Sequence, residues 1–333
     1  MPTHGPLVDR FGRVHTDLRL SITDRCNLRC VYCLPDEKIV FRPRAEILTF
    51  EEIARIARVA RSIGVRTARI TGGEPLVRKG VVELVSQLSE VGFDELAMTT
   101  NGTGLAELAR PLAEAGLTRV NVSCDSLRNE RYAEIRRRGE LSRVLESMGA
   151  AEAAGLRPVK INVVLIGGVN DDEVLDFAIH ARETGRTVRF IEFMPLDATG
   201  LWSRDAVVPS ESVLATINDT YPLVALDPLR SGHEPADRFR FADGAPGEIG
   251  VIASVTRAFC GACNRLRLTA DGAIRNCLFS DDEVPIRDLM RAGGSDEAVA
   301  LEIRRCVWGK HPGHGINDPG FLKPVRSMSM IGG

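Results

Sequence analysis

The sequence has no apolar run as long as a transmembrane helix, and its first residues lack the apolar segment of a signal peptide. Its 43 basic and 45 acidic residues nearly cancel, so the overall charge does not point to DNA or a membrane surface as a partner. We therefore expect a cytoplasmic protein that binds neither nucleic acid nor membrane. Any basic site must be local.

The chain also lacks the motif G-x-x-x-x-G-K-[ST], so a bound nucleotide would not be held for phosphoryl transfer. A disulfide framework is not expected either, because the cytoplasm is reducing. The eight cysteines are informative through their spacing instead. Cys124 and Cys306 are isolated, and we expect both to be small buried apolar side chains. The other six form two sets: Cys26, Cys30 and Cys33, then Cys260, Cys263 and Cys277.

Short β-like runs alternate with helical patterns from residue 18 to about residue 195. In "TFEEIARIARVARSIG", Thr49 suits the N-cap of a helix and Gly64 suits its end. In "NDDEVLDFAIHARETG", Asn170 precedes an acidic first turn and Gly185 ends the run. Repeated strand–helix units predict a parallel sheet with right-handed crossovers. The expected strands begin at Leu18, Thr67, Glu95, Arg119, Val159 and Val188.

One face of these strands is repeatedly polar and often cationic, with Arg19, Arg69 and Lys160 among its members. A sheet covered by helices on both faces would have nearly continuous apolar strands. A closed eight-stranded barrel would fill its lumen with Val, Ile and Leu. We therefore predict an α/β fold, an incomplete (βα)6 TIM-like barrel whose solvated lumen favours an anionic ligand. The alternative is that these residues lie at strand ends and face water.

The alternation of β-like and helical segments ends after about residue 200. The segment "DPLRSGHEPADRFRFADGAPGEIG" is rich in Gly, Pro and charge, and it predicts a boundary near residue 232. Short β-like pieces follow, with "ADG" as a hairpin turn, and then a helix around Val299 to Cys306. We expect an N-terminal tail of residues 1–13, a partial barrel of residues 14–231 and a C-terminal domain of residues 232–333.

The first cysteine set, "CNLRCVYC", lies just past the end of the first strand, where barrel loops build active sites. Three thiolates would leave one iron of a 4Fe-4S cluster free for another ligand. Zinc also fits the spacing, and unrelated cysteines are a third alternative. The next strand ends in "TGGEP", whose glycines expose backbone groups to a ligand or simply form a tight turn.

Together, the CxxxCxxC loop and the GGE motif resemble the radical S-adenosylmethionine (SAM) superfamily. The resemblance implies that the open iron binds the amino and carboxylate groups of SAM, whose reductive cleavage gives a 5′-deoxyadenosyl radical. It further implies that Gly73 presents its backbone to the SAM amino group. Tyr32 and Met194 could instead be core residues, and Ser123 a strand-end hydroxyl. The implied SAM-binding residues are Tyr32, Gly73, Ser123 and Met194.

The second cysteine set lies in "FCGACNRLRLTADGAIRNC" and has the spacing C-x2-C-x13-C. With Cys306, His311 or His314 as a fourth ligand, it would be a structural zinc ribbon. However, the run "RLR" places two guanidinium groups beside the cysteines. Arginine clusters suit phosphates or a polarised carbonyl, and a purely structural ribbon does not need them.

Over nearly its whole length the chain resembles the GTP 3′,8-cyclase family of molybdenum cofactor biosynthesis. The matching segments include "ARITGGEPLVRKG", "VNVSCDSL", "RFIEFMPL", "FCGACNRLRLTADG" and the terminal "SMSMIGG". The resemblance implies two 4Fe-4S clusters with three cysteine ligands each, the second binding the guanine base of GTP. The implied GTP contacts are Arg19, Arg69, Thr100, Lys160, Arg265, Leu266 and Arg267.

The same resemblance makes Gly332 and Gly333 a functional tail, which the residues alone would suggest to be a frayed terminus. Cys124 departs from the family, which usually has an aliphatic residue there. Strand alternation turns Cys124 away from the lumen, so we expect it to pack in the core.

The implied activity is that of a lyase catalysing the first step of the pathway. Hydrogen abstraction from C3′ of GTP, addition of the resulting carbon radical to C8 and reduction of the adduct, assisted by the second cluster, would give (8S)-3′,8-cyclo-7,8-dihydroguanosine 5′-triphosphate. The implied partners are GTP, an electron donor and the next enzyme of the pathway, with a homodimer left open. Two alternatives remain: a radical SAM enzyme that modifies peptides, for which the segment before residue 18 looks too short, and a non-enzymatic zinc-binding scaffold.

Overall fold

A single curved sheet runs through the protein in the strand order β12-β11-β10-β1-β2-β3-β4-β5-β6-β9-β8-β7. A computed structural model describes residues 1–34, 40–197, 200–226 and 234–332. The strands are β1 (Asp17–Ser21), β2 (Thr67–Thr71), β3 (Glu95–Thr100), β4 (Arg119–Ser123), β5 (Lys160–Leu165), β6 (Thr187–Glu192), β7 (Leu223–Ala225), β8 (Asp237–Phe241), β9 (Glu248–Ile252), β10 (Arg265–Leu268), β11 (Ala273–Arg275) and β12 (Val284–Pro285).

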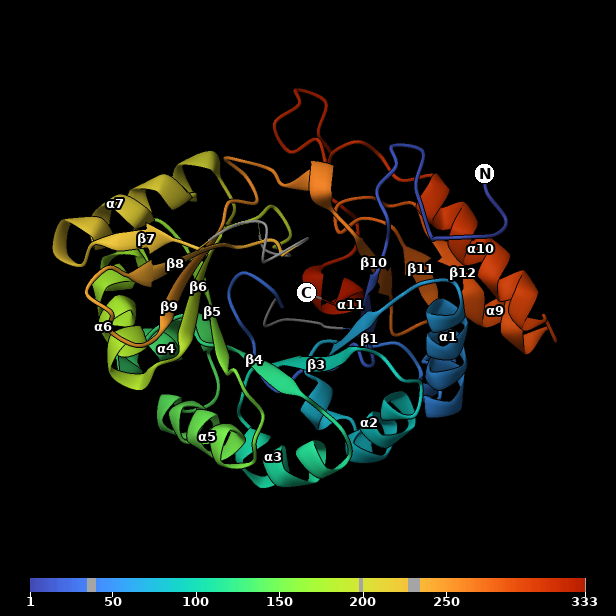
Figure 1. Cartoon of the computed structure of the whole chain (residues 1–333), viewed down its shortest axis with the longest axis horizontal. Helices are drawn as coiled ribbons and strands as arrows, with labels where there is room; N and C mark the ends of the chain where they lie inside the picture. Colours follow the sequence, from blue (N-terminus) through green and yellow to red (C-terminus); the bar gives the residue numbers. More distant parts are fainter. Residues whose placement is uncertain (35–39, 198–199, 227–233, 333) are drawn as a thin grey trace.

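Helices cover the outer side of the sheet, so that the sheet curves around an open interior (Figure 1). In the barrel these are α1 (Phe50–Ser62), α2 (Val81–Ser89), α3 (Leu105–Glu114), α4 (Asn129–Arg136), α5 (Leu141–Ala153) and α6 (Val174–Thr184). The later helices are α7 (Ser210–Thr220), α9 (Ile286–Arg291), α10 (Asp296–Trp308) and α11 (Met328–Ile331).

The six predicted strand–helix units are confirmed as strands β1 to β6, each parallel to the next. The predicted helix ends are confirmed as well. Thr49 accepts from the Glu52 backbone N–H, and the Glu52 side chain accepts from the Thr49 backbone N–H, which completes a capping box before α1. Gly185 ends α6 with a φ of +72°, a conformation that favours glycine.

The chain after residue 234 extends both edges of the barrel sheet. Strand β9 is parallel to β6 and begins one edge, while β10 is parallel to β1 and begins the other. The sheet does not close, because β7 and β12 are its two ends. The incomplete TIM-like barrel is therefore confirmed. The predicted boundary at residues 231–232 lies outside the described residues.

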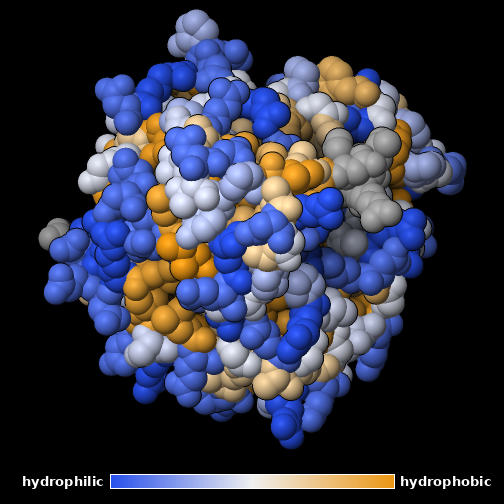
Figure 2. Space-filling view, turned by 60° about the vertical axis from the view of Figure 1, so that its left-hand side comes forward, coloured by the Kyte–Doolittle hydropathy of each residue, from blue (hydrophilic) through white to orange (hydrophobic). Residues whose placement is uncertain are grey.

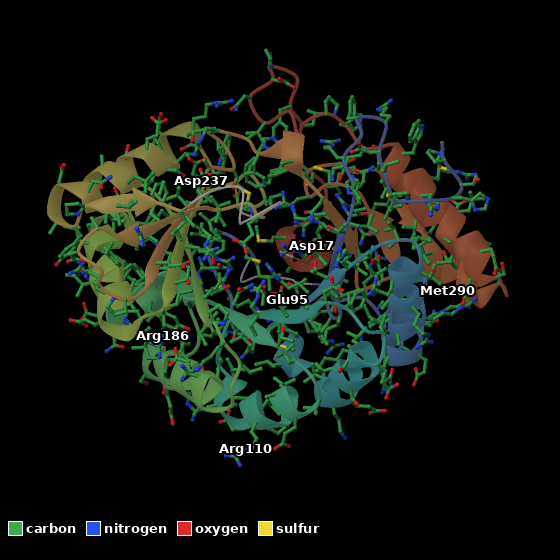
Figure 3. The ribbon with its side chains drawn as sticks, in the orientation of Figure 1. Asp17, Glu95, Arg110, Arg186, Asp237 and Met290 are labelled. Atoms are coloured by element: carbon green, nitrogen blue, oxygen red, sulfur yellow. The ribbon has the colours of Figure 1, made fainter. Side chains whose placement is uncertain are left out.

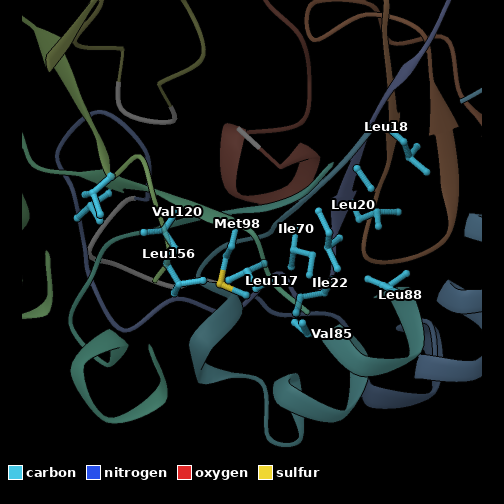
Figure 4. Close-up of a cluster of buried hydrophobic side chains, with 14 of the residues drawn as sticks. Leu18, Leu20, Ile22, Ile70, Val85, Leu88, Met98, Leu117, Val120 and Leu156 are labelled. Carbon is cyan, nitrogen blue, oxygen red and sulfur yellow. The ribbon is translucent and has the colours of Figure 1, made fainter. Parts of the chain in front are cut away.

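An apolar core fills the space between the sheet and its outer helices (Figure 4). Leu18, Leu20 and Ile70 face this core, while Arg19 and Arg69 pair in register on the opposite face. This alternation is the one that the strand sequences predicted. The expectation for the two isolated cysteines is confirmed too, because Cys124 and Cys306 are both buried in the same core.

The C-terminal segment enters the interior of the curved sheet. Helix α11 lies inside the curve in Figure 1. Gly332 is buried, and a Cβ atom built on it would stand 2.9 Å from side-chain atoms of Ser21 and of Thr71. Gly332 is therefore packed rather than frayed, contrary to the alternative that the residues alone would suggest. Close packing against two strands fixes the position of this segment.

The outer surface is mainly hydrophilic on the face shown in Figure 2, with hydrophobic residues in patches between hydrophilic ones. Within the described ranges, no helix combines the length and the apolar character needed to cross a membrane.

Glu192, at the end of β6, ties three elements together. Its buried carboxylate accepts hydrogen bonds from the backbone N–H groups of Ser210 (3.0 Å), Val255 (2.7 Å) and Thr256 (2.8 Å), and from the Thr256 hydroxyl. These contacts hold α7 and the segment after β9 against the end of β6. They fix the loop that continues from β6 to Met194.

We expect Glu192→Gln to lower the free energy of unfolding by about 1–3 kcal/mol, because its amide would direct a donor at buried N–H groups. Urea unfolding monitored by circular dichroism measures this change. The control is Glu183→Gln, on the exposed face of α6, for which we expect a change within about 0.5 kcal/mol. Equal stability of the two variants would contradict the role given to Glu192.

Candidate functional site

One cavity inside the curved sheet gathers both cysteine sets. The strand faces that line it are those predicted to be polar, and helix α11 contributes Met328. The predicted site residues that line the cavity are Arg19, Cys26, Cys30, Tyr32, Cys33, Arg69, Gly73, Thr100, Ser123, Met194, Cys260, Cys263, Arg265, Arg267 and Cys277.

A buried ion pair supports the first cysteine loop. Arg136, at the end of α4, lies 2.7 Å from the Asp125 carboxylate, and its Nη1 donates to Cys30 Sγ at 3.3 Å. The Tyr32 hydroxyl donates to the same carboxylate at 2.7 Å. The backbone N–H of Arg29 donates to the Arg136 carbonyl oxygen. The backbone of the loop and the Cys30 thiol are therefore held by α4 and by Asp125, which follows β4.

The sequence analysis missed Asp125 and Arg136. Asp125 lies two residues after the end of β4 at Ser123, so its position at a strand end was the available signal. Arg136 belongs to the run Arg136–Arg138, in which the sequence gives no sign of which residue is buried. The structure buries Arg136 and exposes Arg138.

Burial raises the pKa of Cys26 to about 11 and also raises the pKa values of Cys30 and Cys33. Thiolates at this loop therefore require a bound positive group, as metal ligation would supply.

The Thr-Gly-Gly-Glu turn packs directly against the cysteine loop. Gly73 donates its N–H to the Thr23 carbonyl oxygen at 2.7 Å, and a Cβ atom on Gly73 would stand 2.3 Å from the Arg25 carbonyl oxygen. Glycine is therefore required there by close approach. The N–H of Gly73 is thus used within the protein. Its carbonyl oxygen is the backbone group that can accept a hydrogen bond from the amino group of a ligand.

Glu74 fixes the other end of this turn. Its buried carboxylate accepts from the Thr100 hydroxyl at 2.7 Å and from the Asn101 N–H at 2.6 Å. Burial raises the pKa of Glu74 to about 7, although these hydrogen bonds oppose the shift. Thr100 thus lines the cavity while its hydroxyl proton is directed at Glu74.

One sulfur atom of the second cysteine set, that of Cys263, lies between two cations. Cys263 Sγ accepts from Arg265 Nη2 and from Lys310 Nζ, each at 3.3 Å. Burial opposes ionisation, but the charges of Arg265 and Lys310 prevail and lower the pKa of Cys263 to about 6. By contrast, burial raises the pKa of Cys260. Lys310 was not among the predicted site residues.

In the part of the chain that the structure describes, no three His, Cys, Asp or Glu side chains converge closely enough to hold a single metal ion. A cluster takes each thiolate on a different iron, so its ligands do not need to converge on one point.

The alternative fourth ligands of the second set lie in different surroundings. Cys306 is buried in the core, with Sγ 3.6 Å from the Ile274 carbonyl oxygen. The His311 side chain is largely exposed and lies 3.5 Å from Asp282. Only His314 lines the cavity, where its ring stacks obliquely with Phe279 at 5.0 Å between centroids.

Guanidinium groups from several strands face one another across the cavity. Burial, together with the charges of Arg19, Arg119 and Arg189, holds the pKa of Arg69 well below its usual value. The pKa values of Arg189 and Arg267 fall to about 9 from burial and neighbouring cations. A site whose cations repel one another in this way favours an anionic ligand.

Carboxylates balance only part of this charge. Asp17 lies 2.8 Å from Arg19, and Glu95 lies 2.6 Å from Arg119. Both acids lie inside the ring of helices in Figure 3. Among the described residues, Arg69 and Arg189 have no carboxylate within 4.0 Å, and Arg69 Nε has no hydrogen-bond partner. Arg189 was missed by the sequence analysis, although it alternates with the core residue Phe190 in β6.

Some predicted residues lie just outside the cavity lining. Lys160 is buried and lies 3.6 Å from Glu234, and burial lowers its pKa to about 8. Leu266 faces the apolar core, so only its backbone is directed toward the site. The Gly332 carbonyl oxygen accepts a hydrogen bond from Arg267. Gly333 lies outside the described residues.

The first cysteine loop fits the cofactors that the sequence motif implies. Three thiols line the cavity next to a glycine carbonyl, and Arg136 Nε is buried there without a hydrogen-bond partner. A cluster supplies the positive charge that the buried thiols need.

Comparisons with known proteins agree with this fold and site. Residues 20–180 match the Radical SAM superfamily, and residues 186–316 match the family described as Molybdenum Cofactor Synthesis C. The fold is similar to that of SuiB from Streptococcus suis bound to S-adenosylmethionine, with a TM-score of 0.60, 14% identity and coverage of 87% of this chain and 68% of that chain. It is also similar to anSMEcpe with bound AdoMet, with a TM-score of 0.56, 15% identity and coverage of 90% and 82%.

The fold and the first cysteine loop thus define a radical SAM protein, a class that uses SAM and a 4Fe-4S cluster. Relatives that match nearly the whole chain identify the family within this class. GTP 3′,8-cyclase of Rhodopirellula baltica is 46% identical over 98% of this chain and 92% of its own length. The GTP 3′,8-cyclase of Corynebacterium glutamicum is 47% identical, and the match covers 98% of this chain and 89% of that protein. The GTP 3′,8-cyclase of Streptomyces coelicolor is 46% identical, and the match covers 98% of this chain and 96% of that protein. The chain belongs to the GTP 3′,8-cyclase family, and the family resemblance noted in its sequence is confirmed.

We expect Arg136→Met to lower the melting temperature by about 6 °C or more, because it leaves the Asp125 carboxylate buried without its partner at a cost of about 3 kcal/mol. Anaerobic differential scanning calorimetry of the purified protein measures this shift. Arg138→Met removes an exposed arginine two residues away and should change the melting temperature by less than about 2 °C. Similar shifts for the two variants would contradict the support role of Arg136.

Proposed function

We propose that this protein is a lyase that converts GTP into (8S)-3′,8-cyclo-7,8-dihydroguanosine 5′-triphosphate, the first step of molybdenum cofactor biosynthesis. The observation that carries the proposal is a single cavity lined by two cysteine triads and by arginines from the strands. One triad serves the cofactor SAM and the other serves the substrate. The guanidinium groups supply the site for a triphosphate.

Cys26, Cys30 and Cys33 would hold one 4Fe-4S cluster, leaving one iron open for SAM. When bound, the reduced cluster and SAM supply the 5′-deoxyadenosyl radical that removes hydrogen from the substrate. The carbonyl oxygen of Gly73 orients the SAM amino group. Tyr32 is held by Asp125 beside this loop, and Ser123 and Met194 complete the lining.

Cys260, Cys263 and Cys277 would hold a second 4Fe-4S cluster, whose open iron receives the guanine base. Support comes from the two cations at Cys263, which favour its thiolate. Arg265 stacks over the Phe259 ring at 4.7 Å, which keeps its guanidinium beside the triad.

The remaining cations would bind the triphosphate and fix the ribose between the two triads. Arg19, Arg69 and Arg267 line the cavity, and Lys160 lies buried near its edge. Phosphate oxygens accept bidentate hydrogen bonds from guanidinium groups, and their charge relieves the repulsion among these side chains. This arrangement would direct C3′ toward the SAM site, so that the C3′ radical could add to C8 before an electron and a proton reduce the adduct.

The C-terminal tail would close the cavity and exclude water from the reacting carbons. Its support is the contact between Arg267 and the Gly332 carbonyl oxygen, which joins the tail to a predicted substrate contact. The proposed partners are an electron donor and the next enzyme of the pathway, to which the product passes. A homodimer is compatible with this function and is not required by it.

The test is anaerobic incubation of the reconstituted protein with SAM, a reductant and GTP, followed by chromatography of the products. We expect 5′-deoxyadenosine in quantity only when GTP is present, together with the cyclised nucleotide. Cys277→Ala should abolish the cyclised nucleotide, whereas Cys306→Ala, a change in the core, should retain it. Full activity of Cys277→Ala would refute the second cluster.

We expect Gly332→Ala to lower turnover at least about tenfold, since its Cβ would collide with Ser21 and Thr71 at 2.9 Å and its φ is +83°. Steady-state assays of the cyclised nucleotide measure this loss. The control is Gly320→Ala, where a Cβ atom meets nothing within 4 Å and turnover should be unchanged. Wild-type turnover of Gly332→Ala would show that the tail does not need its packed position.

A further inference from the structure

A single buried lysine joins the parts of the second cysteine triad. The Lys310 residue is only 3% exposed, although lysine is rarely buried without a specific partner. Its ammonium group donates to Cys263 Sγ at 3.3 Å, to the Arg265 carbonyl oxygen at 3.1 Å and to the Asn276 carbonyl oxygen at 2.6 Å. These three acceptors use all three of its N–H bonds.

The acceptors come from both segments that carry the triad. Arg265 is the first residue of β10 and Cys263 lies two residues before it, while Asn276 directly precedes Cys277. Lys310 itself follows α10, so the contact ties that helix to the triad. The Asn276 side chain strengthens the link by donating to the Cys306 carbonyl oxygen at 2.7 Å. Lys310 therefore links three segments of the chain: the one before and at the start of β10, the one before Cys277, and the one that follows α10.

Cys260, the remaining cysteine of the triad, has a separate support. Arg13 Nη1 donates to the Cys260 carbonyl oxygen at 2.8 Å and to that of Pro312 at 3.0 Å. Arg13 is itself paired with Asp9 at 2.5 Å, so its charge is largely balanced. It holds the backbone of Cys260 rather than a sulfur atom.

The charge of Lys310 is not balanced in this way. Among the described residues, no carboxylate oxygen lies within 4.0 Å of its ammonium group. The comparable cation at the first triad, Arg136, lies 2.7 Å from the Asp125 carboxylate. A buried ammonium without a carboxylate partner is costly unless an anion faces it. The nearest group that can carry negative charge is the sulfur of Cys263.

We propose that Lys310 is a positioning residue that fixes the second triad and raises the reduction potential of the cluster held there. The proposal rests on the second cluster of the proposed function. A hydrogen bond and a positive charge at a ligating sulfur favour the more negative, reduced state of a cluster. Loss of this lysine therefore destabilises the cluster and makes it harder to reduce.

The experiment isolates the second site. The first site is removed by the combined substitutions Cys26→Ala, Cys30→Ala and Cys33→Ala, and the chain is reconstituted anaerobically with iron and sulfide. Into this background we introduce Lys310→Met and the conservative Lys310→Arg. Iron and sulfide content, iron loss to a chelator and the midpoint potential from an EPR-monitored redox titration are then measured.

A matched control comes from the same C-terminal segment. Lys323 also forms a close contact, at 2.8 Å to the Asp197 carboxylate, and its ammonium group is not bonded to a cysteine. Lys323→Met therefore removes a lysine ion pair without touching the triad. Circular dichroism of each variant checks that the fold is retained.

We expect Lys310→Met to lose iron about tenfold faster to the chelator and to have a more negative midpoint potential, with Lys310→Arg and Lys323→Met close to the background chain. Unchanged iron loss and potential in Lys310→Met would overturn the proposal. So would an equal effect of Lys323→Met. If Lys310→Met does not fold, Lys310→Gln removes the charge but keeps N–H donors. A more negative midpoint potential of the cluster in Lys310→Gln would then support the proposal, and an unchanged one would overturn it.

Failure of the second cluster itself gives a different result. In that case the background chain, with Lys310 intact, binds no iron–sulfur cluster, and the proposed function loses its second site. If the background chain binds a cluster and the Lys310 variants match it in iron loss and midpoint potential, only the role of Lys310 is refuted.

Discussion

Repulsion among buried cations inside the curved sheet is the constraint on which the site depends. Arg69 lies among other guanidinium groups, and burial and neighbouring cations lower the pKa values of Arg69, Arg189 and Arg267. An apolar lumen would have closed the barrel as a packed core. Here the polar face keeps the interior open, and under the proposed function a triphosphate would offset the charge that the fold leaves unbalanced. Binding of that substrate would then relieve the repulsion among these cations.

The open sheet allows the second triad to reach the same cavity as the first. Strand β10 pairs with β1 in parallel, so Arg265 and Arg267 stand in register with Asp17 and Arg19. Residues almost 250 positions apart in the sequence therefore form one continuous polar surface. The tail fills the remaining gap, because Gly332 fits between Ser21 and Thr71 only without a side chain. In this way, sheet edges that could attract other strands are used to complete the site.

Local sequence patterns predicted the six strands, their polar face and both cysteine sets, because alternation and spacing are short-range properties. The same patterns could not predict which charged residues are buried. Arg136 and Arg138 belong to one run, yet only the first lies in the interior. Lys310 is likewise indistinguishable from a surface lysine in sequence, since its three acceptors come from distant segments. The burial of Gly332 also depends on tertiary packing, which a terminal Gly-Gly does not indicate.

Under the proposed function, SAM and GTP occupy one cavity, with C3′ of the ribose directed at the SAM site. The most direct test uses GTP carrying deuterium at C3′, incubated anaerobically with the reduced protein and SAM. Mass spectrometry of the 5′-deoxyadenosine then reports whether hydrogen has moved between the two ligands. We predict that deuterium from C3′ appears in the 5′-deoxyadenosine. Formation of 5′-deoxyadenosine without that deuterium, alongside the cyclised nucleotide, would contradict the placement of the two ligands.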